Sequence, residues 1–256
     1  MNISVIVVTL NEERRLKDCL ESLKRFNDLK VVDLGSSDRS VEIAQEMGHM
    51  VVTHPWVPIG EMVLPTVMPT MKNDWIIRVD PDEVLPPDLI DDLNDLEPDE
   101  KDGIISVPYQ YYFINKRLDT TVWGGLRQIP RVINRKRVVV EPEVHRALQC
   151  KPGYKTIALP HRSENAVKHY WNDSYSQLFS KHTRYIPMEG KSRYNDGQRF
   201  SLKALLLNPL RSLKYSLINC SGWHGGWHGW FLSFFFASYE LGALLSLHRY
   251  ERQIKK

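Results

Sequence analysis

The sequence lacks several patterns that would assign its class at once. Its three cysteines, Cys19, Cys150 and Cys220, are odd in number and far apart. This argues against a disulfide scaffold or a zinc site and is typical of a protein from a reducing cytoplasm. No Gly-x-Gly-x-x-Gly follows the first apolar run and no loop carries a Walker lysine, so dinucleotide-binding and P-loop sites are not predicted. No charged leader precedes that run, and a cleavable signal is therefore not expected.

An excess of charge of one sign is also missing. The formal net charge is +3 for 256 residues, which gives no indication of nucleic acid as a partner. What positive charge there is lies towards the C-terminus. From residue 181 onward, twelve Lys and Arg residues stand against four acidic ones, and many aromatic residues accompany them.

Apolar runs alternate with amphipathic segments in the first part of the chain. The runs at 3–10, 30–34 and 50–53 predict strands, and the segments between them predict helices, the first capped by Asn11 and the second ending at Gly48. This order indicates an α/β protein with a doubly wound parallel sheet. Four prolines within 55–72 predict a short or kinked helix. Further strands are expected at 103–114, 131–140 and 156–159.

Three carboxylates follow a buried strand predicted at 75–79. Asp80, Asp82 and Glu83 lie within four positions, at the carboxyl end of that strand. Open α/β sheets bind ligands at this edge, and carboxylate oxygens suit Mg²⁺ or Mn²⁺. The alternative is that Asp82 and Glu83 cap the helix expected to begin near Pro87.

From Ser174 the pattern becomes helical, with a basic amphipathic segment at 200–218 and an apolar helix ending near 247. Three interpretations stay open for the apolar helix: it lies in the plane of a membrane surface, packs on its own domain or a partner subunit, or spans the membrane. His224 and His228 have the spacing of metal ligands on a helix, but nearby glycines favour a loop.

Three motifs together give the chain a resemblance to a known family. They are SVIVVTLNE at 4–12, VVDLGSSDRS at 31–40 and DWIIRVDPDE at 74–83. In order and spacing the chain resembles the family-2 glycosyltransferases, which have the GT-A fold. The Val-His step at 144–145 is similar to that of bacterial lipopolysaccharide core β-glucosyltransferase-like enzymes.

The resemblance implies a GT-A (Rossmann-like), mostly parallel central sheet with flanking helices, and a helical C-terminal extension. Residues 1–170 would form the catalytic domain, and residues 171–256 a helical region for acceptor or membrane-surface association. The implied activity is inverting transfer of a hexosyl group from a nucleotide-sugar to a glycan or lipid-linked acceptor, in envelope polysaccharide or lipopolysaccharide biosynthesis.

The same resemblance, together with the chemistry of the side chains, gives candidate site residues. Contacts to the nucleotide-sugar are expected from Thr9, Asn11, Glu12, Asp33, Asp38, Asp80 and Arg131. Asp80 and Asp82 match the Asp-x-Asp motif and are the expected ligands of a divalent metal, Mn²⁺ or Mg²⁺. Arg127 is a further candidate for supplying positive charge to the phosphate groups. The candidate catalytic residues are Glu143, Glu141 and His145, which follow a predicted strand.

Some positions depart from the family pattern. Leu34 replaces a second aspartate, the segment at 60–63 lacks an expected cation, and Arg146 stands where relatives often have glutamate. A non-catalytic nucleotide-sugar or glycan binding module is therefore the alternative function. A sugar-1-phosphate nucleotidyltransferase is less favoured, because no glycine-rich basic loop follows the first strand.

The implied partners are a UDP-sugar donor, a glycan or lipid-linked acceptor and a membrane surface. The expected location is cytoplasmic, peripheral on the inner face of the cell membrane. The sequence leaves open whether the chain forms a homo-oligomer.

Overall fold

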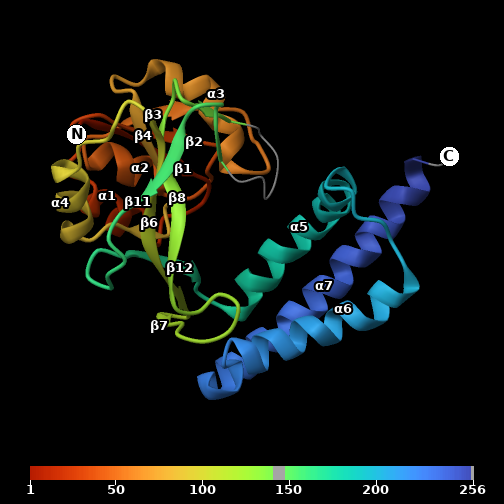
Figure 1. Cartoon of the computed structure of the whole chain (residues 1–256). Coiled ribbons are helices and arrows are strands. Elements are labelled where there is room, and N and C mark those ends of the chain that lie inside the picture. Colours follow the sequence, from red (N-terminus) through yellow and green to blue (C-terminus); the bar gives the residue numbers. More distant parts are fainter. Residues whose placement is uncertain (141–147, 255–256) are drawn as a thin grey trace. The chain divides into compact units, whose positions relative to one another are not determined.

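The computed structural model describes residues 1–140 and 148–254, and Figure 1 shows an α/β architecture with a helical C-terminal part. The chain forms two units. The first consists of Met1–Gln110 and Leu126–His169, and the second of Tyr111–Gly125 and Tyr170–Lys256.

The first unit begins with the predicted strand–helix alternation. Its elements are β1 (Ile3–Thr9), α1 (Leu16–Ser22), β2 (Leu29–Asp33), α2 (Ser40–Glu46), β3 (Met50–Thr53) and β4 (Trp75–Val79). The strands run in the order β3-β2-β1-β4, and all three ladders between them are parallel. Every residue of β1 is buried, as expected for a strand covered on both faces.

The rest of the sheet is mixed in direction. β8 (Leu126–Asn134) continues from β4 in antiparallel direction, followed by β6, β12 and β5. The further elements are β5 (Glu83–Val84), α4 (Pro87–Asp95), β6 (Asp102–Phe113), β7 (Lys116–Arg117), β11 (Lys155–Ala158) and β12 (Val167–Asn172). β9 (Val138–Val139) and β10 (Gln149–Cys150) form a separate ladder. The strand predicted at 131–140 is therefore two shorter strands.

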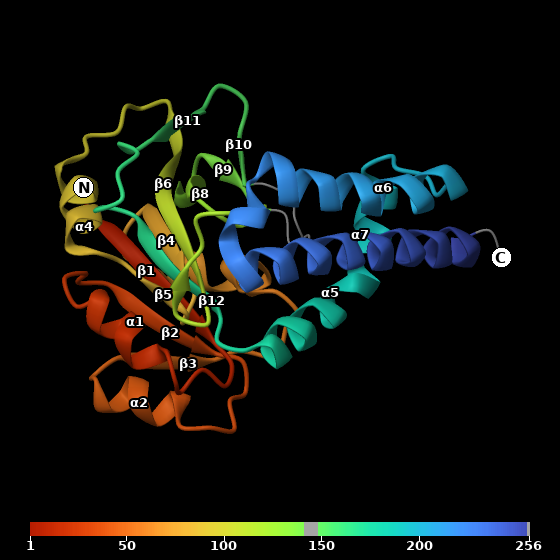
Figure 2. The same ribbon diagram turned by 90° about the horizontal axis from the view of Figure 1, so that it is seen from below.

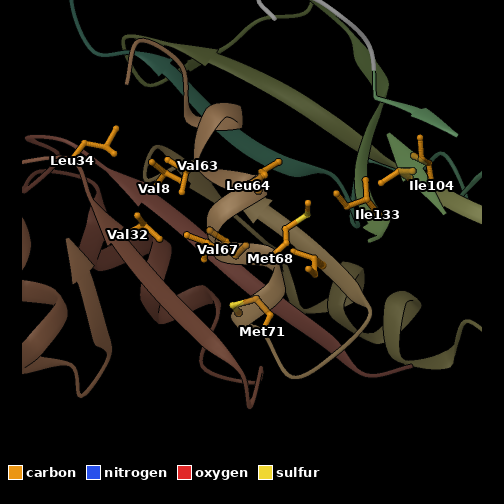
Figure 3. Packing of buried hydrophobic residues seen from close by; sticks show 13 residues of the cluster. Val8, Val32, Leu34, Val63, Leu64, Val67, Met68, Met71, Ile104 and Ile133 are labelled. Atoms are coloured by element: carbon orange, nitrogen blue, oxygen red, sulfur yellow. The ribbon is translucent and has the colours of Figure 1, made fainter. Parts of the chain in front are cut away.

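One face of the sheet is covered by the proline-rich segment. This segment folds as η1 (Gly60–Val63), α3 (Leu64–Val67) and η2 (Met68–Thr70), which confirms the expected short, irregular helix. Val63, Leu64 and Val67 pack there against Val8 and Val32 of the sheet (Figure 3). Because side chains alternate along a strand, Val5 and Val7 of β1 point to the opposite face. Figure 2 shows α1 and α2 running along β1, β2 and β3.

The second unit contains three long helices. They are α5 (Tyr175–Asn195), α6 (Leu202–Lys214) and α7 (Gly226–Ile254). A π-helical turn, η3 (Tyr215–Asn219), and a 3-10 turn, η4 (Gly222–Gly225), join α6 to α7. Ser174 caps α5 and Ser201 caps α6 through their side-chain oxygens.

Aromatic side chains form the core of the second unit. Phe113, Trp171, Leu178 and Phe235 belong to one buried cluster. The Tyr175 hydroxyl lies 3.0 Å from Nδ1 of His228. His228 lies in the first turn of α7, whereas His224 belongs to the preceding 3-10 turn.

Helices α5 and α7 approach each other closely at Gly190. A Cβ atom added there would come within 2.5 Å of the backbone oxygen of Ser246. At Gly242, an added Cβ would instead meet the end of the flexible Ile186 side chain at 2.9 Å.

We expect Gly190→Ala to lower the free energy of unfolding by about 1–3 kcal/mol, because backbone atoms of α7 must move to admit the methyl group. The matched variant Gly242→Ala gains helix propensity of up to about 1 kcal/mol and displaces only a side-chain end, so its stability should be equal or higher. Urea unfolding followed by circular dichroism measures both. Equal stabilities of the two variants would contradict the close α5–α7 packing.

Candidate active site

The chain reverses direction where β4 ends, at residues 80–83. The amide of Glu83 donates a hydrogen bond to the carbonyl oxygen of Asp80 at 2.9 Å. This closes a four-residue turn with Pro81 in the second position, where its fixed φ is favourable. The turn brings the carboxylates of Asp80, Asp82 and Glu83 together at the carboxyl end of β4.

Glu83 is the fully buried member of this group, with a side chain 0% exposed. Its Oε2 accepts hydrogen bonds from the Asp80 amide at 3.0 Å and from the Tyr109 hydroxyl at 3.2 Å. Its Oε1 lies 2.8 Å from Nη2 of Arg131. Burial raises the pKa of Glu83, and the charge of Arg131 opposes that rise. Arg131 therefore offsets part of the cost of burying a carboxylate that water cannot reach.

A β-bulge in β8 accounts for the direction of Arg131. In the ladder with β6, Ile105 lies opposite Val132 and Ser106 lies opposite Pro130, so Arg131 is the extra residue. Bulges redirect one side chain, and they are one of the few places in a sheet that tolerate proline. The bulge thus directs the guanidinium towards the turn of residues 80–83.

A second guanidinium lies on the other side of Asp80. Arg78, from β4, donates a hydrogen bond through Nη1 to Oδ1 of Asp80, and its Nη2 lies 2.8 Å from Oε1 of Glu61. Arg131 Nη2 lies 3.5 Å from the other carboxylate oxygen of Asp80. Burial alone would lower the pKa of Arg78, but Asp80 and Glu61 hold it above its ordinary value. Gly60 leaves room for this guanidinium, since a Cβ there would lie 3.0 Å from Arg78 Nη1.

His169 completes the arrangement from β12. The antiparallel β5–β12 ladder places it directly opposite Glu83. Its Nε2 lies 3.3 Å from Oδ2 of Asp82, and its Nδ1 lies 3.7 Å from Oε1 of Glu83. The imidazole is 10% exposed and the Asp82 carboxylate 16% exposed, so both border the surface of the site.

We term this group of side chains the charge network. Its members are Glu61, Arg78, Asp80, Asp82, Glu83, Arg131 and His169. Among the described residues, the four carboxylates of the network contact two guanidinium groups and one imidazole.

The donor set of the network fits a metal ion only in part. Within residues 1–140 and 148–254, no cluster of three or more His, Cys, Asp or Glu side chains has a geometry that holds a metal ion. Asp82 and His169 nevertheless pair a carboxylate with an imidazole, and Mn²⁺ accepts both. Two protein ligands suit an ion that takes its other ligands from phosphate groups and water, as Mg²⁺ and similar ions do in phosphate-binding enzymes.

A cavity of about 280 Å³ adjoins the charge network in the first unit. Glu61, Arg78 and Arg131 contribute its charged lining. Its other walls are mainly apolar, from α3 and from the strands β4 and β8, together with Val140 and Leu148. The cavity therefore combines apolar walls with converging charged groups, as ligand sites commonly do.

The loops after β1 and β2 are bonded to each other. The side-chain oxygen of Asn11 accepts hydrogen bonds from the amides of Ser37 at 2.7 Å and Asp38 at 3.4 Å. The Glu12 amide donates to Ser40 Oγ at 2.8 Å, and Asp38 accepts from the Glu13 amide at 3.0 Å. The predicted nucleotide contacts at Asn11, Glu12 and Asp38 are thus brought together at one sheet edge.

These bonds also correct the expectation about the cap of the first helix. Asn11 does not cap α1, which begins at Leu16, because its side chain is used across the two loops and its φ is +56°. Asp38 lies one residue before Arg39, the N-cap of α2, and its carboxylate accepts a hydrogen bond from the Ser40 amide at 2.9 Å. The alternative role of Asp82 and Glu83 as helix caps is also wrong, since Pro86 occupies the N-cap of α4 without a side-chain bond.

Two other predicted contacts lie beneath these loops. The Asp33 carboxylate accepts hydrogen bonds from the amides of Gly35 and Ser36, at distances of 3.0–3.2 Å, and so shapes the turn after β2. Thr9 is buried, and its hydroxyl has no hydrogen-bond partner among the residues that the structure describes. Leu34 packs in the apolar core instead of offering a polar group. Arg127, in register with Tyr109, is exposed.

The predicted catalytic residues Glu141, Glu143 and His145, and Arg146 beside them, lie outside the described residues. Their roles stay predictions.

Sequence reasoning missed Arg78, Glu61 and His169 as members of the site. Arg78 interrupts an apolar strand, and a buried charge of this kind requires a partner. His169 alternates with the buried Val167 and Trp171, a pattern that places all three on one face of a strand. Both signals were present in the sequence, but neither identified the partner.

We expect Arg131→Met to lower the free energy of unfolding by about 3–5 kcal/mol, because it leaves Glu83 buried without a countercharge. Adding Glu83→Gln should recover much of the loss, since the amide oxygen can still accept hydrogen bonds from Tyr109 and the Asp80 amide. The loss in the single variant should shrink at acidic pH. Protonation of Glu83 removes the unpaired charge, and the pKa of Glu83 is higher in the folded than in the unfolded state. Thermal melts across pH measure this, and a single variant as stable as the starting protein would contradict it.

Comparison with known proteins gives consistent results. The family model described as glycosyl transferase family 2 matches residues 4–145. An uncharacterized glycosyltransferase of Rickettsia typhi is 26% identical over 207 residues, covering 78% of this chain and 70% of that protein. One of Rickettsia bellii is 26% identical over 205 residues, covering 77% and 69%.

Among solved structures, glucosyl-3-phosphoglycerate synthase from Mycobacterium tuberculosis is similar at a TM-score of 0.48 and 16% identity, covering 73% of this chain and 78% of that chain. That structure is a complex with Mn²⁺, uridine-diphosphate and glucosyl-3-phosphoglycerate. The family model spans more than half of the 256 residues and includes the turn at 80–83, and the chain accordingly belongs to glycosyl transferase family 2.

Proposed function

We propose that this glycosyltransferase moves a hexosyl group from a UDP-sugar to a glycan or lipid-linked acceptor, with inversion at the anomeric carbon. The proposed setting is envelope polysaccharide or lipopolysaccharide biosynthesis at the inner face of the cell membrane. Within this proposal, residues 1–170 carry the donor site and the chemistry. Residues 171–256 serve acceptor or membrane-surface association.

The observation that carries the proposal is the charge network at the carboxyl end of β4. Two guanidinium groups hold Asp80 from both sides, and Asp82 lies beside the imidazole of His169. The nearby loops after β1 and β2 carry Asn11, Glu12 and Asp38, the proposed contacts to the nucleotide. Phosphate oxygens between these loops and the network would meet both a metal ion and Arg131.

Asp82 is the proposed principal metal ligand, with Asp80 and His169 beside it. A divalent cation bound there would neutralise charge on the leaving diphosphate. Arg78 fixes the orientation of Asp80, because its guanidinium bonds both that carboxylate and Glu61. Arg131 pairs with Glu83 beneath the turn, and its other N–H groups would lie near the phosphate groups of the donor.

The adjoining cavity is the proposed position of the donor sugar. In the displacement, an acceptor hydroxyl oxygen forms a bond to the anomeric carbon while the bond from that carbon to the diphosphate oxygen breaks. The hydroxyl proton passes to a general base, for which Glu143, Glu141 and His145 are the candidates. UDP leaves with the bonding electron pair. Apolar walls such as Leu64 and Ile129 exclude water from the sugar.

Donor turnover tests the catalytic part of the proposal. With Mn²⁺, the protein should release UDP from a UDP-hexose slowly without an acceptor, and chelator should abolish the release. Asp82→Asn should lower the rate roughly a hundredfold or more, because stabilisation of the leaving charge by a metal contributes several kcal/mol. Asp95→Asn, at an exposed carboxylate at the end of α4, is the matched control and should leave the rate unchanged.

UDP binding without any turnover would instead support the non-catalytic binding module. An Asp82→Asn variant with full activity would remove the metal role assigned to that carboxylate.

The stereochemistry of transfer gives a separate prediction. From an α-linked UDP-hexose, direct displacement should give a β-linked product, because the acceptor oxygen approaches opposite the leaving diphosphate. Proton NMR of the anomeric signal in the first product formed measures this. An α-linked product would contradict the inverting mechanism while leaving the transferase assignment intact.

A further inference from the structure

Helix α6 exposes an apolar face that its own unit does not cover. Leu202, Leu206 and Leu210, spaced four residues apart, are 71%, 69% and 63% exposed. No residue of α6 is buried, although its other side packs against α7. An exposed apolar surface of this kind commonly marks a contact with a partner or a membrane. This face of α6 therefore needs a partner to cover it.

Positive charge is interleaved with these leucines. Lys203, Arg211 and Lys214 are all exposed on α6, and the helix contains no acidic residue. No Asp or Glu occurs between Asp196 and Glu240. Leucines flanked by cations suit an anionic lipid surface, where acyl chains accept the leucines and phosphate headgroups accept the charge. A second copy docked symmetrically would bring the same cations face to face.

Further exposed apolar side chains follow in the turns between α6 and α7 and in the first turn of α7. Tyr215, Ile218, Trp223 and Trp227 are each more than half exposed, the last being 72% exposed. Tryptophan and tyrosine prefer the headgroup level of a bilayer, because their rings are apolar and each carries a polar atom.

The packing of α7 indicates that it lies along the surface rather than across the membrane. The helix is long and apolar enough to span by composition. Its middle, however, is bonded to α5: Arg193 forms two hydrogen bonds with Glu240 at 3.0 and 2.7 Å, and Tyr239 donates to Glu189 at 2.9 Å. Spanning would carry these charged groups and α5 into hydrocarbon or break the bonds, and either is costly.

We infer that the exposed face of α6, with the aromatic turns that follow it, docks in the plane of an anionic phospholipid bilayer. Leu202, Leu206 and Leu210 enter the headgroup–acyl boundary, and Lys203, Arg211 and Lys214 contact lipid phosphates. This inference deepens the proposed function. It rests on that function for the statement that the acceptor is met at a membrane.

Vesicle sedimentation tests the inference with the full chain. The protein should sediment with vesicles of mixed phosphatidylcholine and phosphatidylglycerol, and far less with phosphatidylcholine alone. High salt should weaken the binding, and alkaline carbonate should release the protein. Leu206→Glu with Leu210→Glu should lower partitioning roughly tenfold or more. The variant lacks the two leucine side chains whose transfer from water to the bilayer favours binding. Lys203→Glu with Lys214→Glu should lower it by a similar factor, since each cation near an anionic surface contributes to binding.

Matched controls change equally exposed residues elsewhere. Met50→Glu removes an apolar side chain on β3 that is 63% exposed, and Lys17→Glu with Lys101→Glu reverses two exposed cations of the first unit. Neither should alter partitioning. All α6 variants should keep the far-UV circular dichroism spectrum and the rate of UDP release without vesicles, which separates loss of docking from loss of the proposed catalysis.

Three results would overturn the inference. They are α6 variants that bind vesicles as well as the controls, equal binding to neutral and anionic vesicles, and retention of the protein after carbonate treatment. A stable dimer in the absence of lipid, dissociated by the leucine variants, would assign the face to a second copy instead.

Discussion

The pairing of Glu83 with Arg131 is the interaction on which the candidate site depends. A carboxylate without solvent exposure is costly unless a cation and hydrogen bonds compensate it, and Glu83 receives both. Its bond to the Asp80 amide also holds the turn of residues 80–83 closed. The orientation of Asp80 and Asp82 therefore follows from a charge pair beneath them.

Several elements of the sheet position the charged side chains around the turn. The bulge in β8 directs Arg131 inward, and the β5–β12 ladder places His169 opposite Glu83. Arg78 supplies a cation where the segment at 60–63 provides only Glu61. The result is a group of four carboxylates held by two guanidinium groups and an imidazole. In the proposed function this group binds a divalent ion together with a diphosphate and not the ion alone, because the diphosphate supplies further ligands.

Much of the fold was predictable from the sequence, but only part of the site. The parallel strands and the acidic turn have local signals, since an apolar run that ends in Asp80 and Asp82 is visible in the sequence, and the two other motifs made its interpretation specific. The Asn11 cap was predicted wrongly because its competing partners, Ser37 and Asp38, lie on a different loop. Arg78 and His169 showed unusual polarity within strands, yet their partners come from distant segments that only the sheet order brings together. Pro130 marked the bulge without indicating where Arg131 would point.

Calorimetric titration of UDP into the protein, with and without Mn²⁺, tests the central claim most directly. The account predicts that Mn²⁺ alone binds weakly, that UDP binds much more tightly when Mn²⁺ is present, and that this gain disappears in Asp82→Asn. UDP binding of equal strength with and without the metal would contradict a network that is completed by a metal-bound diphosphate. Tight binding of Mn²⁺ without nucleotide would contradict it as well.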